Sequence, residues 1–219
     1  MTANATGQAA TAAGAPPPSD AVVPPSPLQG DPAMVGIPNV IAGATGLGLV
    51  TIGAFPAAAA GAALPILLSA TSVGMLIATI WAAALGQNVT ATLYGTILGF
   101  YISYVALGIG LRHDWYGIPA ADASTAVEVY LICWLVAIGA LTLATLRMPS
   151  SFTLLFGLVD LALVLLLIAS YSGSAAVNKA GGWVVMAFVA EAIYIYFHVM
   201  LVATGGKGLP MGRPLLGSG

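Results

Sequence analysis

The stretch FTLLFGLVDLALVLLLIASY, residues 152–171, decides the fold class. It carries one charged residue, Asp160, and it has the roughly 20 residues that an α-helix needs to cross about 30 Å of hydrocarbon. The sequence predicts five further helices of this kind at 34–53, 62–85, 89–111, 126–146 and 182–203. We therefore expect an all-α, polytopic membrane protein with six transmembrane helices per protomer.

The composition agrees with a chain that lives in a bilayer. Of its 219 residues, 59% are hydrophobic and 5% are charged, whereas about a quarter of the residues in a typical soluble domain are charged. The net charge of −2 is small, and no stretch gathers Lys or Arg into a patch that would neutralise phosphates. We expect the lipid bilayer as a partner and no nucleic acid.

The chain divides into a membrane block and two tails. Residues 1–33 form a Pro/Ala-rich N-terminal tail with too little apolar surface to offset the entropy of ordering, so we expect disorder there. Residues 34–204 form the six-helix transmembrane domain, and residues 205–219 form a short C-terminal tail that reads like the first. Within the block, Thr125 followed by Glu128 predicts a capping box at the start of the fourth helix.

Small residues recur at every fourth position in two of the predicted helices. The second helix carries Gly74 and Ala78, and the third carries Gly95 and Gly99. Because positions four residues apart share one face of a helix, such ribbons let two helix backbones approach closely. The partner helix belongs either to the same protomer or to a neighbouring one.

Asp160 and Glu191 fall in the middle of predicted membrane helices. Placing an ionised carboxylate at the bilayer centre costs at least about 2.5 kcal/mol of free energy. Each of these two carboxyl groups must therefore be protonated, paired with a partner or in contact with water. In a dry site the protonated form is favoured, and such a group can exchange a proton with a passing substrate. The alternative is an interhelical hydrogen bond. His198 is the third proton-linked candidate, either as a relay or through a hydrogen bond to a backbone carbonyl.

Motifs of known enzymes are missing from the sequence. There is no His-Glu-x-x-His pair, no Gly-x-Ser-x-Gly elbow and no Walker loop, and the only histidines are His113 and His198. We expect no enzymatic activity, no metal site and no cofactor.

Several short motifs follow one another in a familiar order. They are DPAMVGI at 31–37, GQNVTATLYGTILGFY at 86–101, VYLICW at 129–134, AGGW at 180–183, AIY at 192–194 and LPMG at 209–212. In this order the chain resembles the acetate uptake transporter family, the small succinate-acetate permeases. Its first motif keeps Pro32, Ala33 and Gly36 of the family's opening signature, with Asp31 in place of the family's Asn.

The resemblance implies a homohexamer in which each protomer holds its own path for acetate and similar short carboxylates. It also implies a constriction built from bulky side chains of the first, third and fifth helices. By ungapped matching these positions are Val40, Ile97 and Val159, all of them aliphatic, which implies a wider or differently selective neck.

We therefore expect a transporter or channel for small monocarboxylates, with uptake either coupled to protons or channel-like. The alternative is a nontransporting scaffold or partner-binding subunit of a larger membrane complex. We expect the protein in the plasma (inner) membrane. Six spans would place Arg147, Lys207 and Arg213 on one side against Arg112 and Lys179 on the other, which favours cytoplasmic termini.

Overall fold

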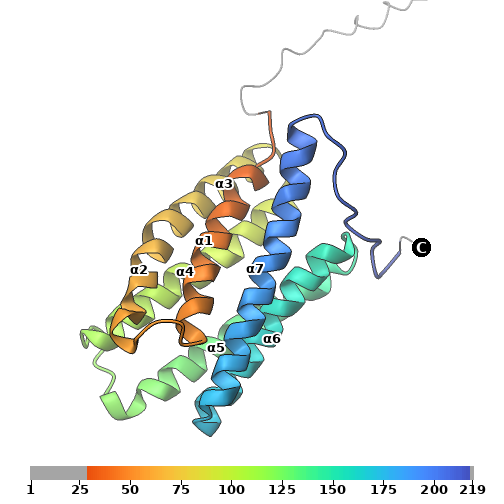
Figure 1. The fold of residues 1–219 in the computed structure, drawn as a ribbon. Coiled ribbons are helices and arrows are strands. Elements are labelled where there is room, and N and C mark those ends of the chain that lie inside the picture. The colour runs from red at the N-terminus through yellow and green to blue at the C-terminus, as the bar shows by residue number, and fades with distance from the viewer. Residues whose placement is uncertain (1–28, 218–219) are drawn as a thin grey trace, which may run out of the picture.

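The computed structural model describes residues 29–217, so most of the predicted disordered tail lies outside the described residues. Six helices in this part of the chain are long and apolar enough to cross a membrane, and the predicted all-α polytopic fold is confirmed. They run antiparallel to their chain neighbours in one bundle (Figure 1). The elements are α1 (Ala33–Thr51), η1 (Ala57–Ala62), α2 (Ala63–Pro65), η2 (Ile66–Thr71), α3 (Ser72–Ala84), α4 (Asn88–Arg112), η3 (Ala120–Asp122), α5 (Ala123–Thr145), α6 (Ser150–Ser172) and α7 (Ala175–Ala203).

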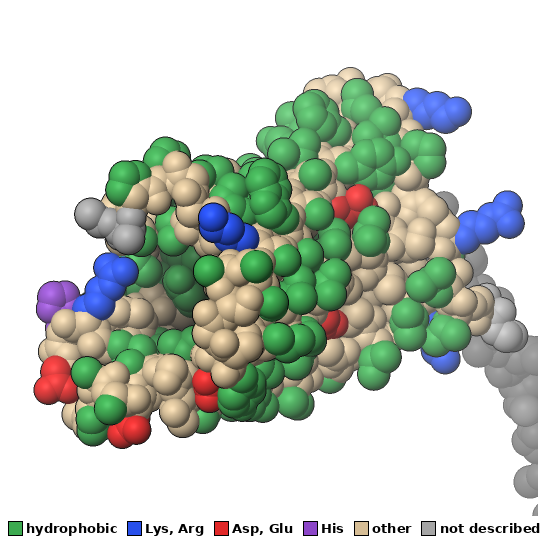
Figure 2. Space-filling model, turned by 60° about the horizontal axis from the view of Figure 1, so that its bottom comes forward, with side chains coloured by type: hydrophobic (Ala, Val, Ile, Leu, Met, Phe, Trp, Pro, Cys, Tyr) green, Lys and Arg blue, Asp and Glu red, His purple; other side chains and the backbone are tan. Residues whose placement is uncertain are grey.

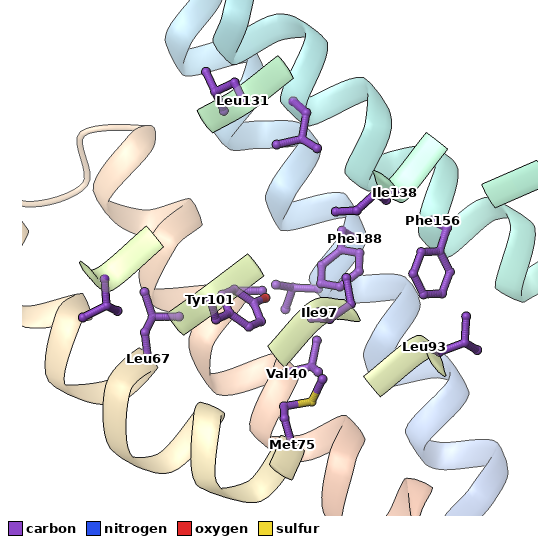
Figure 3. Close-up of a cluster of buried hydrophobic side chains, with 14 residues drawn as sticks. Val40, Leu67, Met75, Leu93, Ile97, Tyr101, Leu131, Ile138, Phe156 and Phe188 are labelled. Carbon is purple, nitrogen blue, oxygen red and sulfur yellow. The ribbon is translucent and has the colours of Figure 1, made fainter. Parts of the chain in front are cut away.

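The helices α1 and α7 hold the bundle together. α1 packs against α7 and α3, α3 packs against α4, α7 packs against α6, and α6 packs against α5. Figure 1 shows α7 between α1 on one side and α6 on the other. Buried side chains from α1, α4 and α7, among them Val40, Ile97 and Phe188, meet in the middle of the bundle (Figure 3).

The second membrane span changes its helical geometry partway along. Residues Ile66–Thr71 form a π-helical turn between α2 and α3. The Ser72 hydroxyl donates to the Leu67 carbonyl five residues earlier, at 2.6 Å, and the Thr71 hydroxyl donates to the Asn39 carbonyl of α1 at 3.0 Å. The widened turn thus places Thr71 against α1, where the missing Cβ of Gly43 leaves room for its side chain.

The sixth span begins earlier than predicted. α7 starts at Ala175, seven residues before position 182, so Asn178 and Lys179 lie inside the helix. Gly173, with φ +65°, ends α6 in the left-handed conformation that favours glycine. The Ser174 hydroxyl then caps α7 by accepting from the Val177 N–H at 3.4 Å.

The predicted capping box at the fourth span is wrong. α5 begins at Ala123, so Thr125 lies within the helix and cannot be its N-cap. Glu128 accepts a hydrogen bond from the Ser170 hydroxyl of α6 at 3.0 Å instead. A partner from a distant part of the chain replaced the local one that the sequence suggested.

Residues 205–217, here called the C-terminal strap, are ordered, unlike the disorder we expected for this segment. The strap returns from the end of α7 toward the start of α6, as Figure 1 shows in dark blue. The Ser151 N–H donates to the Met211 carbonyl at 3.1 Å, and the Leu216 N–H donates to the Leu146 carbonyl at 2.9 Å. The Tyr194 hydroxyl donates to the Pro210 carbonyl at 2.5 Å.

The small-residue ribbons pack within the protomer. A Cβ on Gly74 would overlap the side chain of Asn39, and one on Gly99 would lie 3.0 Å from the Trp134 ring. A Cβ on Gly95 would make ordinary contact with Thr79 at 3.4 Å, and Ala78 is fully buried. The ribbons therefore pack α3 against α1, α3 against α4 and α4 against α5. Because they are used within the protomer, they give no evidence for contact with a second protomer.

Candidate functional site

Two cavities enter the bundle from opposite ends. The larger, of about 590 Å³, lies among the end of α1, the end of α4, the start of α5, the end of α6 and the start of α7. The smaller, of about 480 Å³, lies among the opposite ends of α1, α4, α6 and α7 and is bordered by the strap at Met211. Figure 2 looks onto the end of the molecule that carries the larger cavity and shows a hollow lined by hydrophobic side chains.

The larger cavity is mostly apolar, with hydroxyl and amide groups toward its mouth. Asn178 donates to the Thr51 carbonyl at 3.3 Å, and Ser170 donates to Glu128, so these two mouth residues tie α7 to α1 and α6 to α5. No charged side chain is among the described residues that line this cavity. Its polar lining consists of Thr51, Tyr101, Tyr104, Tyr130, Ser170, Ser174 and Asn178.

The smaller cavity has one charged residue, Asp31, at its edge. The Asp31 carboxylate accepts from the Ala33 N–H at 2.8 Å and so binds the first turn of α1. His198 also lines this cavity, and its Nδ1 lies 2.8 Å from the Leu209 carbonyl of the strap. That contact matches the simpler alternative considered for His198, a hydrogen bond to a backbone carbonyl.

Ile97 and Phe188 line both cavities and therefore stand between them. Each is 6% exposed, and Val40, which lines the smaller cavity, is 8% exposed. Val159 lines the larger cavity. Figure 3 shows Val40, Ile97 and Phe188 meeting from three different helices. We call Val40, Ile97, Val159 and Phe188 the neck.

Phe188 is the neck residue that the sequence analysis missed. Matching to the family drew attention to the first, third and fifth helices, whereas Phe188 lies on the sixth. A signal was present, because the apolar residues Phe188, Ala192 and Ile195 recur at the spacing of one helix face, and all three line the smaller cavity. However, α7 has several apolar faces, and only the packing of the bundle decides which of them lines the cavity.

The opening signature lies at the mouth of the smaller cavity. Pro32 is buried, Asp31 and Ala33 line the cavity, and Gly36 packs against the ring of Tyr94 from α4. A Cβ on Gly36 would overlap that ring, so the glycine is what allows Tyr94 to lie there. The signature thus begins α1 and shapes the cavity wall.

Asp160 and Glu191 lie outside the lining of both cavities. Asp160 accepts a hydrogen bond through Oδ2 from the Thr142 hydroxyl of α5, at 2.6 Å. Its Oδ1 and the Oε1 of Glu191 are buried without a hydrogen-bond partner among residues 29–217. For Asp160 this geometry is the interhelical bond, one of the two alternatives that the sequence left open.

Groups of three or more metal-ligating side chains, drawn from His, Cys, Asp and Glu, do not occur in the described part of the chain.

Known proteins resemble this chain in sequence and in fold. Accumulation of dyads protein 2 of Saccharomyces cerevisiae is 33% identical over 147 residues, which is 64% of this chain and 49% of that protein. Ammonia transport outward protein 2 of the same yeast is 33% identical over 123 residues, covering 52% of this chain and 42% of that protein. The chain thus spans about half the length of these two curated relatives.

The fold has a solved counterpart in the bacterial acetate channel SatP. The two structures superpose with a TM-score of 0.73 at 23% sequence identity, over 84% of this chain and 99% of SatP. Residues 13–205 match the GPR1/FUN34/yaaH family, which confirms the resemblance to acetate transporters seen in the ordered motifs. With a family match that takes in all six helices, the chain belongs to the GPR1/FUN34/yaaH family.

Proposed function

We propose that this protein carries small monocarboxylates such as acetate across a membrane, as a channel or a transporter. The observation that supports this most is the pair of cavities that enter one protomer from opposite ends and share Ile97 and Phe188. A solute that moves from one cavity to the other has only this short neck to cross. A scaffold or partner-binding subunit has no need of two such cavities aligned in this way.

The chemistry of the neck favours a neutral solute. Val40, Ile97, Val159 and Phe188 offer no hydrogen bond and no charge, so an anion would lose its hydration there without compensation. A protonated carboxylic acid loses far less. We propose that the acid crosses the neck with its own proton, which couples uptake to the proton gradient and requires no titrating side chain in the neck.

The names of similar proteins agree with a small solute of this kind. SatP is named as an acetate channel, and one yeast relative is named for outward ammonia transport. Ammonia is also small and neutral, so it is the competing solute for the same path. We favour a carboxylic acid because the ordered motifs match the acetate transporters.

Uptake of labelled acetate into proteoliposomes, with an inward proton gradient imposed, tests the function. The parent should accumulate acetate faster with the gradient than without it. Ile97→Trp should block the neck and abolish uptake, whereas Ile168→Trp, on an exposed face of α6 outside both cavities, should leave uptake unchanged. A parent that moves ammonia and no acetate would overturn the proposed substrate.

We also propose a homohexamer in the plasma (inner) membrane with cytoplasmic termini. Large apolar side chains on α3 and α5 are exposed on the single protomer, which supports burial of these faces in lipid or against other protomers. The number six rests on the family resemblance. Among the exposed side chains are Val73, Ile77 and Ile80 on α3 and Val129, Val136 and Leu143 on α5.

A further inference from the structure

Two tyrosines of α4 lie on either side of the neck. Tyr94 precedes Ile97 by three residues and Tyr101 follows it by four, so all three share one face of the helix. Tyr94 lines the smaller cavity, Tyr101 lines the larger one, and Ile97 lines both. On this face of α4, the phenol groups nearest to Ile97 in the sequence are thus Tyr94 on the side of the smaller cavity and Tyr101 on the side of the larger one.

Neither hydroxyl makes a hydrogen bond within residues 29–217, and neither is among the fully buried atoms that lack a partner there, so each hydroxyl reaches the space of its cavity. A hydroxyl that faces an otherwise apolar cavity is expected to bond whatever polar molecule enters it, because an unpaired hydroxyl loses its bond to water without a replacement. The partners of Tyr94 and Tyr101 must therefore come from what occupies the cavities. Three other tyrosines donate to backbone carbonyls, namely Tyr116 to Ala106, Tyr130 to Phe100 and Tyr194 to Pro210, whereas Tyr104, seven residues beyond Ile97 on the larger cavity, makes no such bond within residues 29–217.

The rings that carry these hydroxyls are held in place. The Tyr101 ring packs edge-on against Phe100, with 5.3 Å between ring centroids and 61° between ring planes. The Tyr94 ring lies against the backbone of Gly36 on α1. In Figure 3 the Tyr101 ring lies within the buried cluster, with its hydroxyl on the side toward Ile97 and Phe188. The two donors are thus positioned before any solute arrives.

We propose that the Tyr94 and Tyr101 hydroxyls are paired binding stations that hold the carboxyl group of a small monocarboxylic acid at the two mouths of the neck. The inference rests on the proposed function and adds the residues that select the solute. Each phenol O–H donates to an oxygen of the carboxyl group and replaces a water that the solute gives up on entering the neck. Seven residues of helix separate the stations by about 10 Å, which exceeds the length of acetate, so the solute passes from one station to the other.

The test removes each hydroxyl and keeps the ring. Tyr94→Phe and Tyr101→Phe should each raise the acetate concentration at half-maximal uptake about tenfold, as expected for the loss of one hydrogen bond to a carboxyl group. Their melting temperatures should stay at or above that of the parent, because neither hydroxyl has a protein partner. Tyr130→Phe, which loses its bond to the Phe100 carbonyl, should melt earlier. Tyr171→Phe, exposed and outside both cavities, is the matched control with unchanged uptake.

Binding of labelled acetate to the purified protein, measured by equilibrium dialysis, separates this inference from the proposed function. An active parent whose two Phe variants keep the parental half-maximal concentration would overturn the stations and leave the transport proposal standing. Lower melting temperatures with unchanged binding would identify structural roles and would also overturn them. Acetate binding that depends on both hydroxyls without uptake would uphold the stations and overturn transport. No acetate binding by the parent would overturn the stations whatever the uptake.

Discussion

Gly36 connects the opening signature to the wall of the smaller cavity. Its Cα lies against the Tyr94 ring, and the two residues come from helices that are far apart in the sequence. At this position the size of one side chain decides where an aromatic ring of the proposed path can lie. The glycine of the signature acquires a physical reason only through this contact.

Gly36→Ala should therefore destabilise the protein by about 1–3 kcal/mol and impair acetate uptake, because the added methyl group overpacks the site and displaces Tyr94. Thermal unfolding and proteoliposome uptake measure the two effects. Gly157→Ala on α6 is the matched control, since its Cβ would meet nothing within 4 Å and alanine favours a helix. A Gly36→Ala protein that unfolds and transports like the parent would show that the ring moves aside freely.

The role of the Asp160 carboxyl group follows from one neighbouring side chain, Thr142. Its bond to the Thr142 hydroxyl joins α6 to α5, away from both cavities. Transport should fall as pH rises, because less of the substrate is protonated, and this dependence should not involve Asp160.

Asp160→Asn should then keep the parental pH dependence of acetate uptake while costing no more than about 1 kcal/mol of stability, the scale of an interhelical hydrogen bond in a membrane. Glu191→Gln should behave in the same way, since Glu191 also lies outside both cavities. Uptake measured across pH for both variants checks this. A flatter pH profile in either variant would mean that its carboxyl group titrates during transport.

At the scale of single elements, the C-terminal strap is the segment whose role was least expected. It contacts the start of α6 and the end of α7, and through Met211 it borders the smaller cavity. Its hydrogen bonds use backbone carbonyls of residues 209–211 and the N–H of Leu216. An irregular segment with its polar groups satisfied in this way acts as part of the folded domain.

Removing residues 208–219 should lower the stability by about 1 kcal/mol for each hydrogen bond lost and should open the smaller cavity beside His198. Thermal unfolding of the truncated protein in detergent measures the loss. Arg213→Ala is the control within the strap, because this exposed side chain makes no hydrogen bond or ion pair with other residues of the described range 29–217. Unfolding at the parental temperature after truncation would show that the strap contributes no stability.

At the scale of the whole molecule, the exposed apolar faces decide how protomers meet. The Gly and Ala ribbons are already used within one protomer, so Gly74→Leu or Gly95→Leu would first disturb the protomer itself. The face of α5 is a better site for a test, because large apolar side chains such as Val129, Val136 and Leu143 are exposed on it in the single protomer.

Native mass measurement in mild detergent should find a hexamer. Val136→Trp on α5, where Val136 is 69% exposed, should weaken the assembly if this face meets a neighbouring protomer. Leu76→Trp on the exposed face of α3 tests the second face in the same way. A monodisperse parental monomer that retains acetate uptake would contradict the proposed assembly.

The sequence by itself determined the six spans, because the length and apolar character of a membrane helix are local properties of the chain. The family resemblance also pointed to Val40 and Ile97 as constriction residues, and the structure places both in the buried centre of the bundle beside the cavities. Helix starts were less predictable where a tertiary partner intervened, as at α5, where Glu128 bonds Ser170.

Only the tertiary structure decided which side chains meet across the bundle. Phe188 lies in the neck, and Asp160 accepts a hydrogen bond from Thr142. The strap packs on α6 and α7, and the Tyr94 ring lies against Gly36. Each of these contacts joins residues from different elements, and several helix faces are equally apolar in sequence. Hydropathy places a helix in the membrane, but packing selects the face that turns inward, since lipid tails and protein interiors are similarly apolar.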